Sequence, residues 1–179
     1  NRLFEFVQQE EVHYEFTTEE IVQHTPPFVL IDKLLRIGEI DLHSKLRLEL
    51  AYQEALTNSI EHGNLELESI WREEIDEEGR DRYAKEKAER LKNSKYSQRK
   101  IFLTSKYDGN SLSISIQDQG NGFEYNGHTT KTKSEEPEVP QVHGRGVSIL
   151  KSVMDEVHYD MGGRRVTITK ELKDDPSEE

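Results

Sequence analysis

The chain has 179 residues, carries a formal net charge of −12 at pH 7 with 34% charged residues, and contains no cysteine. The length suits one domain with a sizeable core, and so acidic a surface repels phosphate backbones, so we expect no nucleic-acid partner. Without cysteine there is no disulfide framework, and without a signal peptide or an apolar run near the roughly 18 residues of a membrane span we expect a cytoplasmic protein with no membrane partner.

The first part of the chain contains one stretch with a weak secondary-structure pattern, followed by two stretches with a clear one. Residues 1–13 are weakly patterned and read as an N-terminal extension, and a first residue other than Met indicates a piece of something longer. Residues 14–17 alternate between apolar and polar and predict a strand. Two prolines then open a helix over residues 27–37, which we expect Gly38 to end.

A long helix is predicted over residues 42–62, with Asp41 as its cap and Gly63 at its end. Glu54 and Asn58 are four residues apart and share one face of this helix. Two apolar stripes on this helix predict that it is buried on two sides. The first stripe, Leu46 and Leu50, lies in line with Glu54 and Asn58. The second stripe lies beside it and consists of Leu48, Tyr52, Leu56 and Ile60.

The polar pair on this helix indicates a ligand site. Burying both groups without partners would cost roughly 1–3 kcal/mol each, so a helix that aims them inward is expected to bind something. The neutral oxygen of Asn58 suits a hard cation such as Mg²⁺, and Glu54 can act as a general base. The alternative is an ordinary amphipathic helix with two solvated polar residues.

Residues 65–98 form a charged insertion. Its first half carries an apolar stripe with helical spacing, and a second helix is predicted over residues 81–92. The stripe consists of Leu67, Ile70, Trp71 and Ile75. Its charges are those of a solvated face, and the functional alternative is a docking surface for a partner protein.

The centre of the chain predicts a hairpin. A strand begins at Ile101, the turn 108–110 reads Asp-Gly-Asn, and the returning strand alternates cleanly. Asp118 continues the inward face of the returning strand after Leu112, Ile114 and Ile116. An acid at the inner end of an apolar strand face needs a specific donor.

The last third contains a polar segment, a helix and a strand. Residues 123–143 lack an apolar period and predict a mobile loop that could close over a ligand as a lid. A helix follows over residues 147–157, then a turn at Gly162-Gly163 and a strand over 165–170. The acidic tail 172–179 is expected to be disordered. The inward positions of the helix are Val147, Leu150, Val153, Met154 and Val157.

Three motifs stand in order: Glu54-x3-Asn58, Asp118-x-Gly120-x-Gly122, and Gly144-x-Gly146. The carboxylate of Asp118 can accept a hydrogen bond from the exocyclic amine of adenine, and the glycines after it allow close backbone approach and positive φ. The third motif opens a helix whose free N–H groups suit phosphate. Singly, the two glycine motifs are also typical of a hairpin turn and a loop hinge.

These motifs resemble the boxes of the GHKL ATPase superfamily, which includes gyrases and histidine kinases. Residues 54–63, Glu-Ala-Leu-Thr-Asn-Ser-Ile-Glu-His-Gly, resemble its N box; residues 118–123, Asp-Gln-Gly-Asn-Gly-Phe, its G1 box; and residues 144–147, Gly-Arg-Gly-Val, its G2 box. The resemblance covers residues 14–171. It implies an α+β fold of the Bergerat type, a two-layer sandwich with a mixed, mostly antiparallel sheet, helices on one face and an ATP lid.

The resemblance also implies ATP and Mg²⁺ as cofactors and assigns the residues of their site. Glu54 would be the catalytic base and Asn58 would hold the metal. The residues implied to bind ATP are Asn58, His62, Asp118, Gly120, Gly122, Gly144, Arg145, Gly146 and Val147.

Within the superfamily, the sequence Thr-Asn-Ser-Ile-Glu-His-Gly is most similar to that of the anti-sigma-factor serine kinases. That group implies a homodimer that binds a sigma factor and phosphorylates a serine of an antagonist protein. Two features depart from it: the block 65–98, where compact kinases have a short link, and Arg145 between the G2 glycines. Long inserts of this kind occur in ATPase domains joined to receiver or phosphatase modules. The sequence contains no motif that we can match to the sigma-factor contacts of these kinases.

Two other functions remain open from the sequence. The catalytic domain of a sensor histidine kinase would accompany a phosphoacceptor histidine followed by Glu or Asp, and none of the seven histidines here is followed by either. A module that retains ATP and acts only by sequestering a partner is not separated from a kinase. A chaperone or topoisomerase ATPase is disfavoured, since no transducer domain follows the last strand.

Overall fold

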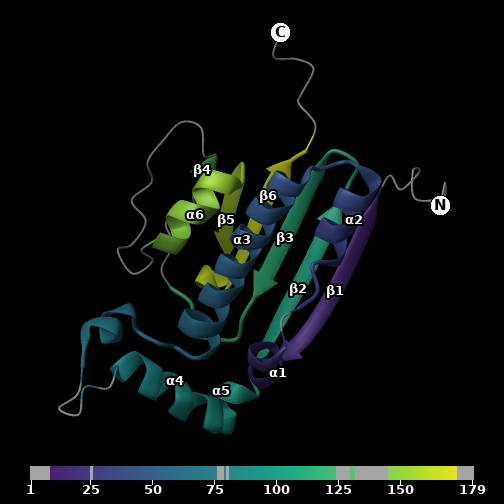
Figure 1. Ribbon diagram of the computed structural model, residues 1–179. Helices are drawn as coiled ribbons and strands as arrows, with labels where there is room; N and C mark the ends of the chain where they lie inside the picture. Colours follow the sequence, from purple (N-terminus) through teal and green to yellow (C-terminus); the bar gives the residue numbers. More distant parts are fainter. Residues whose placement is uncertain are drawn as a thin grey trace.

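The computed structural model describes residues 9–24, 26–75, 79, 81–123, 130–131 and 145–172. They form two layers, an antiparallel sheet with helices on one of its faces (Figure 1). The strands are β1 (Glu10–Thr17), β2 (Lys100–Tyr107), β3 (Ser111–Gln117), β4 (Thr130–Lys131), β5 (Glu156–Asp160) and β6 (Arg165–Glu171). The helices are α1 (Thr18–Gln23), α2 (Val29–Ile37), α3 (Leu42–Asn58), α4 (Arg82–Lys92), α5 (Ser94–Ser97) and α6 (Arg145–Val153).

The strand order in the sheet is β1-β2-β3-β6-β5-β4, and every pairing between the described strands is antiparallel. This confirms the predicted α+β sandwich, although the described pairings include no parallel one. β1 begins at Glu10, so residues 10–13, which the sequence analysis places in an extension, belong to this strand and pair with residues 104–107 of β2. β4 lies within the predicted loop 123–143, of which residues 124–129 and 132–143 lie outside the described part of the chain.

The hairpin between β2 and β3 forms as predicted. The carboxylate of Asp108 accepts hydrogen bonds from the backbone N–H groups of Asn110 and Ser111, at 2.9 and 2.8 Å. Gly109 takes the positive φ, +97°, that the turn requires. The three apolar residues of β3 that face the helices are almost fully buried, and Asp118 follows on the same face: Leu112, Ile114 and Ile116.

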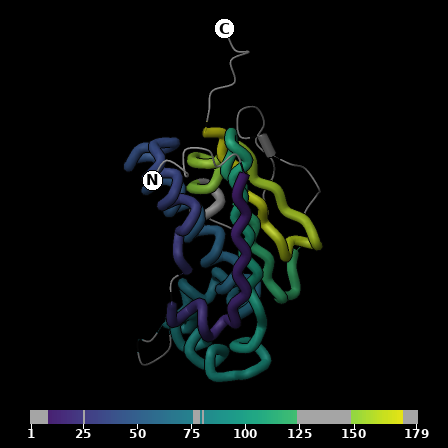
Figure 2. The backbone as a smooth tube through the Cα atoms, turned by 90° about the vertical axis from the view of Figure 1, so that its right-hand side faces the viewer, coloured from purple at the N-terminus to yellow at the C-terminus, as the bar shows by residue number. Residues whose placement is uncertain are grey.

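α3 crosses the sheet between α2 and α6, and Figure 2 shows the helices on one side of the edge strand β1. Asp41 caps it as predicted, accepting from the backbone N–H of Ser44 at 2.7 Å. The burial of its first stripe was predicted wrongly, because Leu46 and Leu50 are 57% and 48% exposed. The helix lies on the sheet with only one broad face, so the neighbouring stripe makes the core: Leu48, Ala51, Tyr52, Ala55 and Leu56.

The end of the long helix also differs from the prediction. α-Helical geometry ends at Asn58 and is followed by a π-helical turn, Ser59–Asn64, so Gly63 lies inside the turn rather than beyond the helix. The amide of Leu65 donates to the carbonyl of Ile60, five residues back, at 2.8 Å. Wide turns of this kind occur frequently at functional sites. Here the turn coincides with the second half of the N box.

The insertion packs as a small helical unit at one end of the sandwich (Figure 1). Its second helix, α4, forms as predicted, whereas the described residues of the first half form a short 3-10 helix, Ser69–Glu73, in place of a longer helix. Trp71 is buried, with the guanidinium carbons of Arg82 and Arg90 at 4.7 and 5.0 Å from its ring centroid. Ile70 is exposed because the short helix presents only one side to the protein, and Ile75, beyond the end of this helix, is exposed as well.

The region after the lid segment contains one more strand than predicted. α6 ends at Val153, and Val157 is buried within β5 rather than on a continued helix. The loop after β5 uses Gly162 and Gly163, both with positive φ, as the predicted turn. Within the described ranges, no helix combines the length and the apolar character that a membrane span needs.

Candidate functional site

The N box and the G1 box meet backbone to backbone. A Cβ atom placed on Gly120 would lie 2.2 Å from the carbonyl oxygen of Gly63, and one placed on Gly63 would lie 2.5 Å from Cγ of Asp118. Neither position can carry a side chain without moving a neighbour. Two glycines 57 positions apart in the sequence therefore bring the carboxylate of Asp118 against the π turn.

Asp118 is 6% exposed and lies directly beyond the last residue of β3. One carboxylate oxygen accepts from the backbone N–H of Gly120 at 2.8 Å, and the backbone N–H of Asp118 donates to the carbonyl of Arg164 at 2.9 Å. Burial raises the pKa of this carboxyl to about 6, against the opposing effects of the Gly120 N–H and the charges of Arg164 and Arg99. A buried carboxylate with one oxygen held by backbone is suited to accept a ligand donor at the other.

Asn64, which the sequence analysis does not name as a site residue, links several segments around the site by hydrogen bonds. Its side chain is fully buried. Its amide donates to Thr18 Oγ1 at 2.9 Å and to the carbonyl of Lys100 at 3.0 Å, while its oxygen accepts from the backbone N–H of Gln119 at 2.7 Å. One side chain thus joins the π turn to α1, to β2 and to the G1 loop.

A cavity of about 800 Å³ opens beside Asp118. This volume is in the range of small-molecule sites, about 300–1,000 Å³. Four segments supply its described walls. These are α3 with the π turn (Ala55, Asn58, Ser59, His62, Gly63), the start of the insertion (Glu66, Leu67, Glu68, Ser69, Ile70, Glu73), the G1 loop (Asp118, Asn121, Gly122, Phe123) and the sheet (Tyr159, Gly163, Val166).

Four of the predicted site residues line the cavity, and two others are not among its described lining residues. Asn58, His62, Asp118 and Gly122 line the cavity. His62 Nδ1–H also donates to the carbonyl of Leu67 at 2.7 Å, which holds the ring at the wall. The two predicted residues that are not among the described lining residues are Glu54, one turn before Asn58 and half-buried, and Gly120, whose role is the contact with the π turn.

The third motif is only partly within the described chain. Gly144 lies outside it, and for Arg145, Gly146 and Val147 the structure describes the backbone of the first turn of α6 but not the side chains. α6 runs antiparallel to α3, with Arg47 near the start of α3 donating to the carbonyl of Ser152 near the end of α6 at 2.7 Å. The N-terminus of α6 therefore lies toward the Asn58 end of α3.

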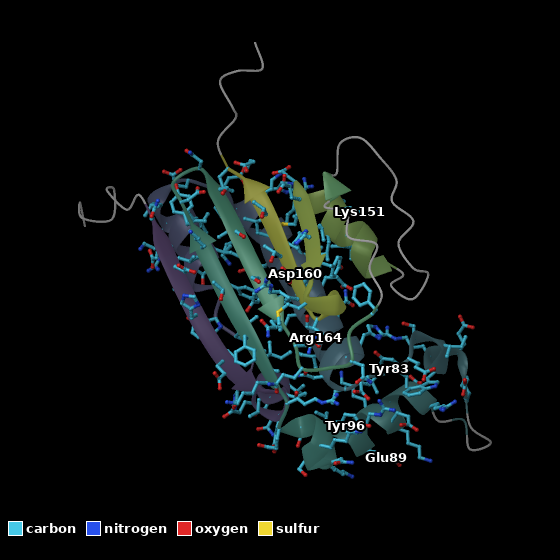
Figure 3. All side chains as sticks on the ribbon, turned by 180° about the vertical axis from the view of Figure 1, so that it is seen from behind. Tyr83, Glu89, Tyr96, Lys151, Asp160 and Arg164 are labelled. Carbon is cyan, nitrogen blue, oxygen red and sulfur yellow. The ribbon has the colours of Figure 1, made fainter. Side chains whose placement is uncertain are left out.

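One wall of the cavity was not foreseen. The rings of Phe123 and Tyr159 pack edge to face with centroids 5.3 Å apart. Gly122 has a φ of +70°, and a Cβ there would lie 2.1 Å from the carbonyl oxygen of Gly162. The G1 loop therefore packs against the turn between β5 and β6, where Figure 3 labels Arg164. Tyr159 belongs to β5, which was not predicted, so this aromatic wall could not be inferred from the local pattern of residues.

The cavity is acidic. Besides Tyr159, its described ionisable side chains are His62, Glu66, Glu68, Glu73 and Asp118, with no lysine or arginine among the described lining residues. No group of three His, Asp or Glu side chains in the described part of the chain is arranged to hold a metal ion. A polyanionic ligand would therefore need a cation of its own or a positive group from outside these walls.

Comparison with known proteins identifies the family. A search of curated proteins by sequence finds none that matches this chain. A family model described as the histidine kinase-like ATPase domain matches residues 30–170, which include all three motifs and every described segment that lines the cavity. The chain therefore belongs to the histidine kinase-like ATPase domain family.

Proposed function

We propose that the chain is an ATP-binding regulatory protein kinase of the anti-sigma-factor type, which transfers the γ-phosphate of ATP to a serine of an antagonist protein, sequesters a sigma factor, or does both. The observation that supports it most is the buried carboxylate of Asp118, held against Gly63 at the edge of a cavity large enough for a nucleotide. Membership of the chain in the histidine kinase-like ATPase domain family supports ATP-using chemistry. The proposed serine specificity rests on the resemblance of residues 57–63 to the anti-sigma-factor serine kinases.

Asp118 would recognise the adenine base. Adenine carries an exocyclic amine that donates a hydrogen bond, and a buried carboxylate is the strongest neutral-pH acceptor a side chain can offer it. Gly63 lets the π turn lie directly against the carboxylate, since a Cβ atom there would lie 2.5 Å from Cγ of Asp118. The apolar part of the base would pack against the wall that contains Phe123 and Tyr159.

Mg²⁺ fits the donor chemistry of the site. Asn58 is a neutral oxygen ligand in the wall, and Mg²⁺ commonly takes one or two protein oxygens together with phosphate oxygens and water. The acidic walls would otherwise repel a triphosphate, so the metal would supply the charge that the described lining lacks. The N-terminus of α6, at the Asn58 end of α3, is suited to bind the phosphates through its free N–H groups.

Glu54 would accept the proton of the substrate hydroxyl. It lies one helical turn from Asn58 on the same face of α3, and it is only half-buried, so part of its side chain is open to an incoming protein substrate. The partners proposed with this role are the antagonist protein and a sigma factor, with a homodimer as the assembly. The location in the cytoplasm stays a prediction from the sequence.

The test is phosphoryl transfer to protein. The chain would be incubated with Mg²⁺, ATP radiolabelled at its γ-phosphate, and candidate antagonist proteins, beside the Glu54→Gln variant. We expect phosphoserine with the parent chain and none with Glu54→Gln, which should bind ATP with unchanged affinity. Label on a histidine would instead support a sensor histidine kinase, and nucleotide binding without transfer to any protein a sequestering module.

A further inference from the structure

One buried carboxylate of the N box accepts hydrogen bonds from three side chains of the insertion. Glu61 is 7% exposed, inside the π turn between Asn58 and the cavity-lining Gly63. Lys87 donates to its Oε1 at 2.6 Å, and the hydroxyl of Tyr83 donates to its Oε2, also at 2.6 Å. Arg72 donates to the same Oε2 at 2.9 Å and to the Tyr83 hydroxyl at 3.0 Å.

The contacts within this cluster determine which of its side chains are charged at neutral pH. Burial by itself would raise the pKa of Glu61, but the hydrogen bonds from Lys87 and Tyr83 and the charges of Lys87 and Arg72 outweigh it, and the net pKa is lowered. Burial and the neighbouring Glu61 raise the pKa of Tyr83 to about 12, so its hydroxyl keeps its proton. At neutral pH the cluster is therefore one carboxylate held by two cations and a phenol donor.

Two further side chains of the same region hold the chain just after the π turn. Arg90 donates to the carbonyls of Leu65 and Glu66 at 2.5 and 2.7 Å. Arg99 donates to the carbonyl of Asn64 at 2.7 Å and forms an ion pair with the carboxylate of Glu66 at 2.7 Å. Glu66 has a φ of +52°, which is unfavourable for a residue with a side chain and is maintained by these contacts.

The insertion therefore lines the cavity and also supports a second part of its wall. Residues 66–70 and Glu73 line the cavity, while α4 holds the π turn that carries His62 and Gly63. Figure 3 shows Tyr83 on the side of α4 next to the end of α3, whereas Glu89, which is exposed, lies on the outer side. A change at α4 can thus reach the nucleotide site through a chain of direct contacts.

We propose that Glu61, Lys87 and Arg72 are positioning residues for the nucleotide: the insertion fixes the π turn through them, and the nucleotide affinity depends on this clamp. The inference rests on the proposed ATP site and goes beyond it, because it assigns the charged insertion a role in ligand binding rather than in solvation or docking alone. The clamp acts through Asn58, His62 and Gly63, which touch the cavity.

The test compares two lysines of one helix. Lys87→Met removes the charge that holds Glu61, and Lys85→Met removes an exposed charge on the same helix. Calorimetry with ADP and with a non-hydrolysable ATP analogue, well below the unfolding temperature of each variant, should show binding about fivefold weaker for Lys87→Met and unchanged for Lys85→Met. Lys87→Arg, which keeps a charged donor, should restore most of the affinity.

Amide hydrogen exchange of the protein without nucleotide is the second measurement. Exchange over residues 58–66 should be faster in Lys87→Met than in Lys85→Met, and parent-like in Lys87→Arg. If the parent chain binds nucleotide and Lys87→Met binds equally well, or Lys87→Arg fails to restore a lost affinity, the inference is overturned while the proposed ATP site stands. If the parent binds no nucleotide, the proposed function fails and the nucleotide role fails with it, whatever the exchange shows.

Discussion

Gly63 and Asp118 are in direct contact: a Cβ atom on Gly63 would lie 2.5 Å from Cγ and 2.6 Å from Oδ2 of Asp118. The carboxylate that faces the cavity is thus positioned by the absence of a side chain on the π turn. Because Asp118 is itself buried, it has little room to move away from an added methyl group.

The first prediction concerns this contact. Gly63→Ala should displace the carboxylate of Asp118 and weaken ATP binding by at least about tenfold, at a stability cost of about 1–3 kcal/mol for the overpacked site. Calorimetry and urea unfolding would measure the two effects. Gly79→Ala is the control, because Gly79 has positive φ but open space around it, so that variant should lose about 1 kcal/mol and bind ATP normally. Parent-like ATP affinity in Gly63→Ala would contradict the assignment.

The second prediction separates binding from stability. Asp118→Asn keeps the shape and the acceptor for the Gly120 N–H but removes a buried charge. At neutral pH it should stabilise the nucleotide-free protein by on the order of 1–2 kcal/mol. The same change should weaken ATP binding more than tenfold, since a charge-assisted acceptor is lost. Asp32→Asn, at an exposed ion pair with Lys45, should change both quantities little; unchanged ATP affinity in Asp118→Asn would exclude the adenine role.

The third prediction is a pH dependence with a defined sign. The pKa of Asp118 is about 6 in the folded protein against 3.8 for the free group, so between about pH 4 and pH 6 the folded state binds more protons than the unfolded state. The free energy of unfolding should therefore fall through this window as the pH rises. Lowered carboxyl pKa values elsewhere act in the opposite sense, so the measured quantity is the difference between the parent chain and Asp118→Asn. A difference that does not change from pH 4 to pH 6 would be evidence against the shift.

The fourth prediction concerns the metal. Asn58→Ala should abolish most of the Mg²⁺ dependence of ATP binding, because it removes the one neutral oxygen ligand that we assign to the cation. Titrations of ATP with Mg²⁺ and with a chelator give the comparison. Gln53→Ala, an exposed carboxamide on the same helix, is the matched control. If ATP binding by Asn58→Ala still depends on Mg²⁺ as in the parent chain, Asn58 is not the ligand.

The fifth prediction tests the junction made by Asn64. Asn64→Ala would remove one buried and two partly buried hydrogen bonds and open a small cavity at a fully buried position, so we expect a loss of about 2–4 kcal/mol in urea unfolding. Asn110→Ala changes the same residue type at an exposed turn and should cost much less. Equal costs for the two variants would show that the junction does not stabilise the fold.

Local patterns by themselves determined a large part of this protein. The hairpin turn at Asp108, the alternating face that leads to Asp118 and the caps at Asp41 and Gly38 depend on neighbouring residues only, and the structure confirms each. The glycine motifs indicated the family because close backbone approach leaves a clear mark in sequence. The family model matches the region that contains them.

Only the tertiary structure decided the rest. Leu46 and Leu50 repeat with the same helical spacing as the buried stripe, and which stripe faces the sheet depends on how α3 packs. β5 is a short strand with one fully buried residue, Val157, so its period is too weak to read. The charge pattern of the insertion predicted a solvated face, because a charged residue in a sequence does not show which residue it will pair with. Lys87 and Glu61 are 26 residues apart and meet only after folding. Glu61 is then buried, and a buried carboxylate needs a charged partner.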